Sequence, residues 1–162
     1  DNLNFSVQNR FNQRDYVYKS EKLKLKEGDK VMQLKNNYEK EVFNGEHGTV
    51  EKYEKKSGTL LVNYEGNMTE YSRDELDEIT LSYVISIHKS QGSEYDFLIL
   101  ILSPAHSMML NRELLYTAVT RAKKKLFIIS DKNTIAAAVQ RSTPGVRRTL
   151  LKRRLDENFN AS

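Results

Sequence analysis

The chain has 162 residues, a length that suits one medium domain or a small pair and allows a buried core. Hydrophobic residues make up 38% and charged residues 30%, with seven glycines and two prolines, which excludes disordered and fibrous classes and indicates a charged globular protein. The formal net charge of +4 comes from 26 basic and 22 acidic residues, so overall charge gives only weak support for binding a polyanion.

The first part of the chain has two different patterns. Residues 1–24 show no regular period and predict no particular element. Residues 25–79 predict a small β-barrel with strands at 29–34, 49–53, 60–64 and 68–72. Asn44-Gly45, Ser57-Gly58 and Gly66-Asn67 supply the turn residues that short antiparallel strands require.

From residue 83 onward the pattern is typical of a parallel α/β layer with helices on both faces. Apolar strands are predicted at 83–87, 97–102 and 126–130, and a final helix follows the last of them. A helix is predicted at 111–122, with Asn111 as its N-cap and Glu113 in its first turn. Lys123, Lys124 and Lys125 are expected at its C-terminus, where cations are favoured.

A basic stretch lies near the end of the chain. Between Arg141 and the acid Asp156 it has no negative charge. Its members are Arg141, Arg147, Arg148, Lys152, Arg153 and Arg154. A nucleic-acid contact and a solvated helix face both remain open for it.

The segment 86–94 holds a dense set of polar donors. It follows a predicted strand and crosses a turn with one glycine, Gly92. Ligands of open parallel sheets bind beyond the carboxyl ends of the strands, so a ligand can meet this segment. Taken alone, its histidine and glutamine are more simply read as surface residues.

A second segment places Arg121 near the end of the predicted helix, where a surface arginine is the simple alternative. Together, "HKSQGSEYD" at 88–96 and "LLYTAVTRAK" at 114–123 resemble motifs V and VI of superfamily-1 helicases, and the RecD-like branch most closely. "GDKVMQLKNNY" at 28–38 and "VFNGEHGTV" at 42–50 are similar to the stretch that leads into the SH3-like insertion of that branch.

The resemblance implies a fold. It is an α/β, RecA-like second motor domain, formed by residues 1–25 and 80–162 and interrupted by a small SH3-like β-barrel at 26–79. The barrel is expected to add DNA contacts from Lys35, Asn36, Asn37 and Tyr38. Base stacking on Tyr38 is one interpretation, and a core or turn tyrosine is the other.

The resemblance also implies roles in nucleotide binding. Arg121 matches the arginine finger that reaches the γ-phosphate, a task that suits a planar, permanently charged fork. Gln91 and Gly92 match positions near the γ-phosphate, where many relatives outside this branch have lysine in place of glutamine. Glu94 matches the acid that contacts the ribose.

Four further residues match positions that approach the backbone of single-stranded DNA: Ser86, His88, Lys89 and Ser90. Hydroxyl, imidazole and ammonium groups are ordinary donors to phosphate. One loop that touches both ligands would couple nucleotide state to the hold on DNA.

The implied protein uses ATP and Mg²⁺ to move along single-stranded DNA, 5′ to 3′ as this branch does, and to unwind duplex. Its expected partners are single-stranded DNA, the N-terminal motor domain of the same protein and exonuclease subunits. The 162 residues contain no Gly-x-x-x-x-Gly-Lys-Ser/Thr, so the phosphate-cradling loop lies elsewhere and the chain alone is expected to be inactive. The acidic run at 74–78 follows no apolar strand and is read as a solvated turn rather than a Walker B pair.

The chain has no cysteine and three scattered histidines, so we expect neither disulfides nor a metal site. Its longest apolar run, 97–102, is too short to cross a membrane and no secretory segment precedes one, which favours the cytoplasm. The start at Asp1 rather than Met suggests a piece of a larger protein, although processing gives the same start.

Three alternatives stay open from the residues alone. The same motifs fit the helicase part of a conjugative relaxase. A non-catalytic nucleic-acid-binding module could keep the fold without the motor, and the barrel could instead bind proteins, because fold does not determine function.

Overall fold

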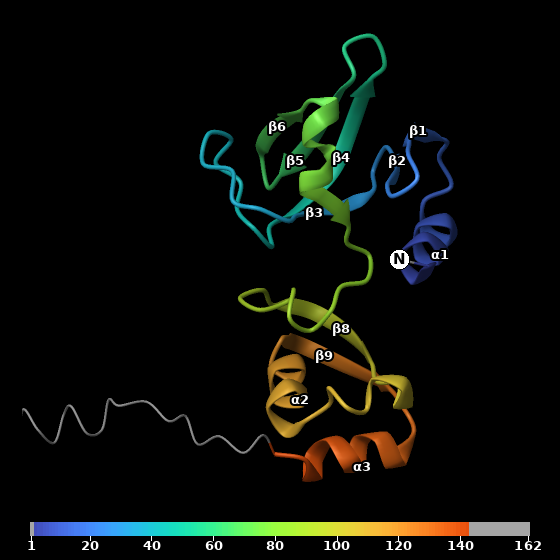
Figure 1. Ribbon diagram of the computed structural model, residues 1–162, viewed down its shortest axis with the longest axis vertical. Helices are drawn as coiled ribbons and strands as arrows, with labels where there is room; N and C mark the ends of the chain where they lie inside the picture. Colours follow the sequence, from blue (N-terminus) through green and yellow to red (C-terminus); the bar gives the residue numbers. More distant parts are fainter. Residues whose placement is uncertain (1, 143–162) are drawn as a thin grey trace, which may run out of the picture. The chain divides into compact units, whose positions relative to one another are not determined.

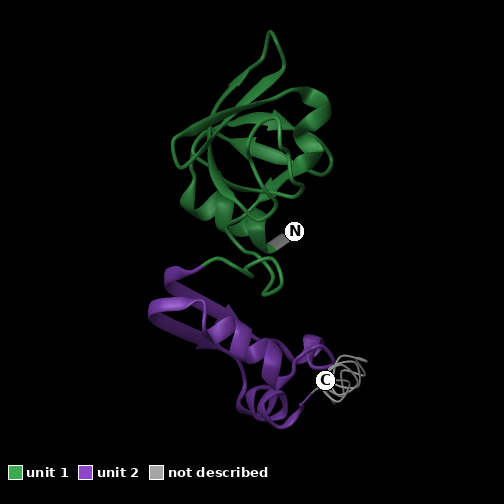
Figure 2. Ribbon diagram, turned by 90° about the vertical axis from the view of Figure 1, so that its left-hand side faces the viewer, with its two compact units in different colours: residues 1–93 green, residues 94–162 purple. Residues whose placement is uncertain are grey.

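A computed structural model of the chain describes residues 2–142, which fall into two compact units that divide between Ser93 and Glu94 (Figures 1 and 2). The first unit is built around an antiparallel sheet and the second around one parallel pair of strands. Apart from Arg141, the late basic stretch lies outside the described residues.

The first unit contains a five-stranded sheet in the order β6-β5-β4-β3-β7. Its strands are β3 (Lys30–Gln33), β4 (His47–Glu54), β5 (Thr59–Tyr64), β6 (Asn67–Tyr71) and β7 (Ile79–Leu81). Along β5, Leu60, Val62 and Tyr64 alternate into the core, as expected for a strand with one buried face. The four predicted strands of the barrel are therefore confirmed, and β7 was missed.

The turns of this sheet differ slightly from the predicted pairs. The β5–β6 hairpin turns on Glu65 and Gly66, which both have positive φ (50° and 105°), because Asn67 already pairs with Tyr64. The acidic run expected to be a solvated turn forms a short 3-10 helix, η1 (Arg73–Glu78). Ser72 begins it, and its backbone N–H donates to Glu75 Oε2 at 2.8 Å.

The N-terminal residues form elements that the sequence pattern did not predict. They are α1 (Asn2–Phe11) and a hairpin of β1 (Tyr16–Lys19) with β2 (Lys24–Lys26). The fully buried side chain of α1 is the polar Gln8, so this helix lacks a clean apolar stripe.

The predicted strand at 83–87 is wrong: this segment is irregular and continues into turns. The physical reason is that its backbone is paired by a side chain. Asn4 Nδ2 donates to the Val84 carbonyl oxygen at 2.7 Å, and the Val84 N–H donates to Asn4 Oδ1 at 2.8 Å. A side-chain amide takes the place of a neighbouring strand, so no ladder extends along 83–87.

The second unit is a β-α-β crossover followed by a helix. Its elements are β8 (Tyr95–Ile101), η2 (Pro104–His106), α2 (Arg112–Val119), β9 (Ala122–Ile129) and α3 (Lys132–Gln140). Asn111 is confirmed as the N-cap of α2, since its side chain accepts from the Leu114 N–H at 2.7 Å. The later two predicted strands and the final helix are also confirmed.

The three lysines expected at the end of α2 lie instead in β9, which is a correction. The helix ends at Val119 because Ala122 already pairs with Tyr95 of β8. Lys124 is accommodated in the strand by an ion pair with Asp96 of β8, at 2.7 Å.

Only one face of the β8–β9 pair is covered by the described residues, whereas helices were expected on both. Helices α2 and α3 lie on one side of the pair (Figure 1). Leu100 of β8 is buried. The other face exposes a set of large apolar side chains, which we call the open face: Phe97, Ile99, Ile101, Phe127 and Ile129, between 48% and 67% exposed. A parallel sheet is ordinarily buried on both faces.

Candidate functional site

The segment 86–93 forms a compact turn closed by its own hydrogen bonds. The Ser90 N–H donates to the Ser86 and Ile87 carbonyl oxygens, both at 3.2 Å, and the Ser90 hydroxyl donates to Ile87 at 2.7 Å. The Lys89 N–H donates to Ser86 Oγ at 3.4 Å. The hydroxyl groups of Ser86 and Ser90 thus already stabilise the turn.

The exposed side of this turn carries the chemistry that a polyanion needs. His88, Lys89 and Gln91 are exposed, whereas Ser90 is buried. Gly92 has φ of +87°, a left-handed conformation that favours glycine. The turn therefore presents an imidazole, an ammonium and an amide group to solvent, together with the exposed Ser86, whereas Ser90 is buried.

Glu94 and Arg121 lie together at the amino ends of the two parallel strands. Tyr95 pairs with Ala122, and the Tyr95 N–H donates to the Arg121 carbonyl oxygen at 2.8 Å. Glu94 and Arg121 therefore each come one residue before a paired strand position. They lie at the amino ends of β8 and β9, whereas the predicted strand at 83–87 implied a site at the carboxyl ends of strands.

Arg121 is partly buried at the end of α2. Its Nε donates to the Thr117 carbonyl oxygen, one helical turn earlier, at 3.2 Å. This bond restricts the plane of the guanidinium group, so the helix end helps to orient the side chain. A phosphate approached by such a fork is bound more specifically than by a lysine.

Glu94 has a partner that the sequence reading missed. Lys123 Nζ lies 3.1 Å from Glu94 Oε2, with both side chains about half exposed. Salt bridges in solvent are weak, so the carboxylate remains available as an acceptor for hydroxyl groups. Lys123 is part of the motif that drew attention to Arg121, but only the strand pairing reveals that it meets Glu94.

The candidate residues thus form two groups, one in each unit. Glu94 and Arg121 belong to the second unit. The first unit holds Ser86, His88, Lys89, Ser90, Gln91 and Gly92.

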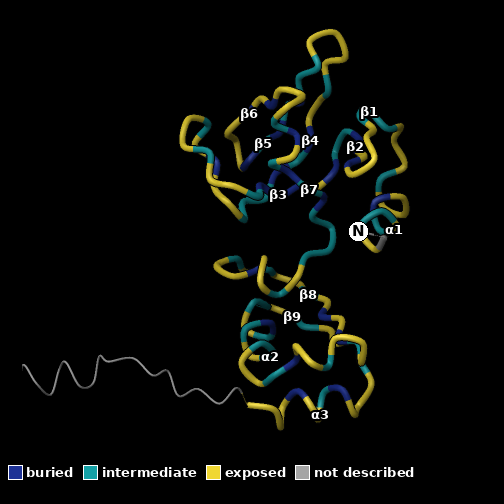
Figure 3. The backbone as a smooth tube through the Cα atoms, viewed as in Figure 1, coloured by how far each residue is buried: buried dark blue, intermediate teal, exposed yellow. Residues whose placement is uncertain are grey.

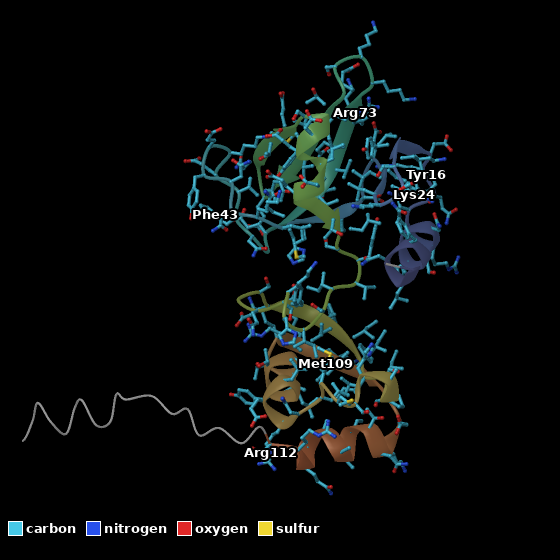
Figure 4. The ribbon with its side chains drawn as sticks, in the orientation of Figure 1. Tyr16, Lys24, Phe43, Arg73, Met109 and Arg112 are labelled. Carbon is cyan, nitrogen blue, oxygen red and sulfur yellow. The ribbon has the colours of Figure 1, made fainter. Side chains whose placement is uncertain are left out.

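The barrel candidates lie in the loop between β3 and β4, which is largely exposed (Figure 3). Tyr38 is 74% exposed and packs edge-on against Phe43 of the same loop, with ring centroids 5.9 Å apart. Phe43 is labelled in Figure 4. Asn37 holds the loop to η1, since its Nδ2 donates to Glu78 Oε2 at 3.3 Å. Tyr38 is therefore a loop residue with an exposed ring, not a core residue. Lys35 pairs with Asp77 at 3.2 Å.

Two further properties concern metals and membranes. In residues 2–142, no three acidic or histidine side chains gather in a way that could hold a metal ion. Within the same part of the chain, no helix is both long and apolar enough to cross a bilayer.

Two protein-family models match the chain. Residues 3–64 match the SH3 domain of ATP-dependent RecD-like DNA helicases, and residues 81–129 match the UvrD-like helicase C-terminal domain. The second match contains both groups of candidate residues, and the first contains the β3–β4 loop.

Curated relatives agree with these matches. The ATP-dependent RecD2 DNA helicase of Deinococcus radiodurans is 38% identical over 143 residues, covering 87% of this chain and 20% of the relative. The RecBCD enzyme subunit RecD of Mycolicibacterium smegmatis is 31% identical over 128 residues, covering 79% of this chain and 22% of the relative. The chain therefore spans about a fifth of the length of these relatives.

Solved structures with a similar fold include two Pif1 helicases. The Bacteroides protein, in complex with ADP-AlF3 and ssDNA, has a TM-score of 0.60 at 19% identity, covering 99% of this chain and 43% of that one. The Candida albicans protein has a TM-score of 0.56 at 16% identity, covering 99% and 47%. Such identities indicate fold alone, and the expected combination of a RecA-like α/β domain with an SH3-like domain is confirmed.

Proposed function

We propose, from the premise that this chain belongs to the C-terminal region of RecD-like superfamily-1 helicases, that the complete protein is an ATP-dependent DNA helicase. It would use ATP and Mg²⁺ to move 5′ to 3′ along single-stranded DNA and separate duplex. The named relatives favour this function over a relaxase or a non-catalytic module.

The observation that carries the proposal is the pairing of β8 with β9. It joins the end of the motif V segment to the end of the motif VI segment, so that Glu94 and Arg121 flank the same strand ends. In this proposal Arg121 stabilises charge that develops on the γ-phosphate, and Glu94 accepts from the ribose. Gln91 and Gly92 lie near the γ-phosphate.

The DNA backbone is proposed to contact the turn at Ser86, His88, Lys89 and Ser90. Ser86, His88 and Lys89 are exposed, whereas Ser90 is buried. The hydroxyls of the two serines already help to close the turn, so the serines would contribute by accepting or sharing hydrogen bonds. The exposed ring of Tyr38 in the barrel is a proposed stacking platform for a base.

The domain boundaries and partners are part of the proposal. Residues 1–25 and 80–162 would form the second motor domain and 26–79 the inserted barrel; β7 lies across this boundary, since Thr80 and Leu81 still pair with β3. The first motor domain would supply the phosphate-cradling loop that the 162 residues lack. Exonuclease subunits are proposed as partners because some relatives are named RecBCD subunits.

The proposal is tested on Arg121 in the complete protein. Arg121→Ala is expected to lower kcat of DNA-stimulated ATP hydrolysis by about 10³-fold or more, the scale of an arginine finger. Arg121→Lys should not restore the rate, because an ammonium cannot bind two phosphate oxygens in a fork. Steady-state hydrolysis with saturating single-stranded DNA measures both, and the isolated 162-residue chain should hydrolyse no ATP.

Lys132→Ala is the matched control, since Lys132 is an exposed cation at the start of α3. Equal rates for Arg121→Ala and this control would show that Arg121 is not the finger. Mg²⁺-dependent hydrolysis by the isolated chain would contradict the assignment of the phosphate loop to another part of the protein.

A further inference from the structure

A buried carboxylate forms a junction at the base of the barrel. The side chain of Asp29, in the turn between β2 and β3, is fully buried. Its Oδ2 accepts from the Lys26 N–H at 2.7 Å and from Gln8 Nε2, and its Oδ1 accepts from Asn12 Nδ2 at 2.7 Å and from the Tyr83 hydroxyl at 2.9 Å. A buried charge is stable only when hydrogen-bonded in this way.

These bonds join three parts of the first unit that are far apart in sequence. Gln8 belongs to α1 and Asn12 directly follows it, Lys26 ends β2, and Tyr83 lies two residues beyond β7. Burial and the hydrogen bond to Asp29 raise the pKa of Tyr83 to about 12, so its hydroxyl stays a donor at neutral pH.

The next residue along the chain is held from the same helix. The Asn4 amide donates to and accepts from the backbone of Val84, at 2.7 and 2.8 Å. Just before it, the Ser82 N–H donates to the Lys30 carbonyl oxygen at 2.9 Å. Residues 82–84 are thus held one after another, by β3, by Asp29 and by Asn4.

This held segment leads directly into the turn at 86–93. Beyond Val84 the bonds of Lys89, Ser90 and Gln91 close within the turn itself. The position of the turn relative to the barrel is therefore determined largely by the bonds at 82–84. The segment that was predicted as a strand instead acts as a tether, which connects the turn at 86–93 to the barrel and α1.

We propose that Asn4 and Tyr83, through Val84 and Asp29, are positioning residues that fix the motif V turn against α1 and the barrel. The inference rests on the proposed function, because the turn is taken to contact DNA. In the proposed domain scheme, the tether connects a motor-domain helix, the inserted barrel and the DNA-contacting turn. Removing the hydrogen bonds of the tether would leave the side chains of the turn unchanged but would lower the affinity of the turn for DNA.

The test uses the complete protein and three variants. Asn4→Ala removes both bonds to Val84, Asn4→Asp keeps only the acceptor, and Tyr83→Phe removes only the hydroxyl. For Asn4→Ala and Tyr83→Phe, the DNA concentration that half-maximally stimulates ATP hydrolysis is expected to rise about 3- to 30-fold, the range for residues that couple sites. Asn4→Asp should be impaired as well, since its carboxylate cannot donate to the Val84 carbonyl.

Two controls separate positioning from a general loss of structure. Tyr18→Phe removes a hydroxyl from another tyrosine that packs on the same core, and Gln13→Ala removes an amide that bonds only the carbonyl oxygens of Asn9 and Arg10. Both should match the wild type in half-stimulating DNA concentration. The KM for ATP without DNA should stay unchanged in every variant.

The outcomes are distinct. A purely structural role would lower the melting temperature or the active fraction and leave the half-stimulating DNA concentration at its wild-type value, which would overturn the inference. Values for Asn4→Ala and Tyr83→Phe equal to those of their controls would do the same. If the wild-type protein shows no DNA-stimulated hydrolysis, the proposed function itself fails, and the tether with it.

Discussion

Individual side chains in both units are oriented by specific partners, some adjacent on a helix and some distant in sequence. The Thr117 carbonyl oxygen accepts from Arg121, Lys123 pairs with Glu94, and Lys40 Nζ lies 2.6 Å from Glu75 Oε2. Each partner limits how far a charged group moves before any ligand arrives. Preorganised groups of this kind bind and stabilise charge more effectively than mobile ones.

Glu75 makes the stability of the fold depend on pH in the acidic range. The hydrogen bond from Lys40, together with those from Ser72, lowers the pKa of Glu75 from 4.5 to about 2. A depressed carboxyl pKa stabilises the fold above the ordinary pKa, and this stabilisation is lost as pH falls through the folded value. The wild-type chain should therefore lose more stability between pH 4.5 and pH 2 than Glu75→Gln.

Urea unfolding followed by circular dichroism at steps of pH measures this difference. Asp74→Asn is the matched control, because Asp74 is an exposed acid in the same helix, η1. It should keep the wild-type dependence on pH. If the free energy of unfolding changes with pH in the same way for wild type and Glu75→Gln, Glu75 is not the group whose titration lowers the stability.

At the scale of elements, the barrel packs two strands closely at one glycine. Gly48 of β4 is buried, and a Cβ at its position would lie 2.6 Å from Val62 Cγ1 and 2.9 Å from Tyr64 Cε1. Both neighbours belong to the core side of β5. β4 therefore has no room for a side chain at this position.

Gly48→Ala is expected to lower the free energy of unfolding by about 1–3 kcal/mol, the usual cost of overpacking a core. Urea unfolding of the chain measures it, with Ser57→Ala in the exposed β4–β5 turn as the control. A Gly48→Ala variant as stable as this control would mean that β4 and β5 separate easily at that point.

The elements that could be predicted from sequence are those whose signals are local. Alternation in β5 and the Asn111 cap of α2 are read from neighbouring residues. The helix α1 could not be predicted, because its buried side chain, Gln8, is matched to Asp29, a distant carboxylate. The segment 83–87 has the apolar composition of a strand, and only the distant Asn4 explains why it is not one.

The candidate site follows the same rule. Arg121 was correctly expected at the end of a helix, since a helical period and a following strand are local patterns. Its neighbour Glu94 was found only through family resemblance, and the ion pair of Glu94 with Lys123 depends on the parallel register of β8 and β9. Register between distant strands has no local signal.

At the scale of the whole molecule, the second unit has a two-stranded parallel sheet with one face that residues 2–142 leave uncovered. The open face gathers side chains such as Phe97, Ile99 and Phe127, which are 48% to 67% exposed. Contiguous exposed apolar side chains mark interaction surfaces or aggregation-prone ones. In the proposed helicase, the remaining part of the motor would cover this face.

Ile99→Lys is expected to have opposite effects in the two contexts. In the isolated 162-residue chain it places a charge on the open face, so self-association, measured by light scattering against concentration, should fall. In the complete protein the same charge would be buried, and the melting temperature should drop, because an unpaired buried charge is costly.

Val139→Lys is the control, since Val139 is 45% exposed on α3, away from the open face, and should change neither measurement. A complete protein whose melting temperature is unaffected by Ile99→Lys would mean that the open face stays in solvent and that the sheet is not completed there.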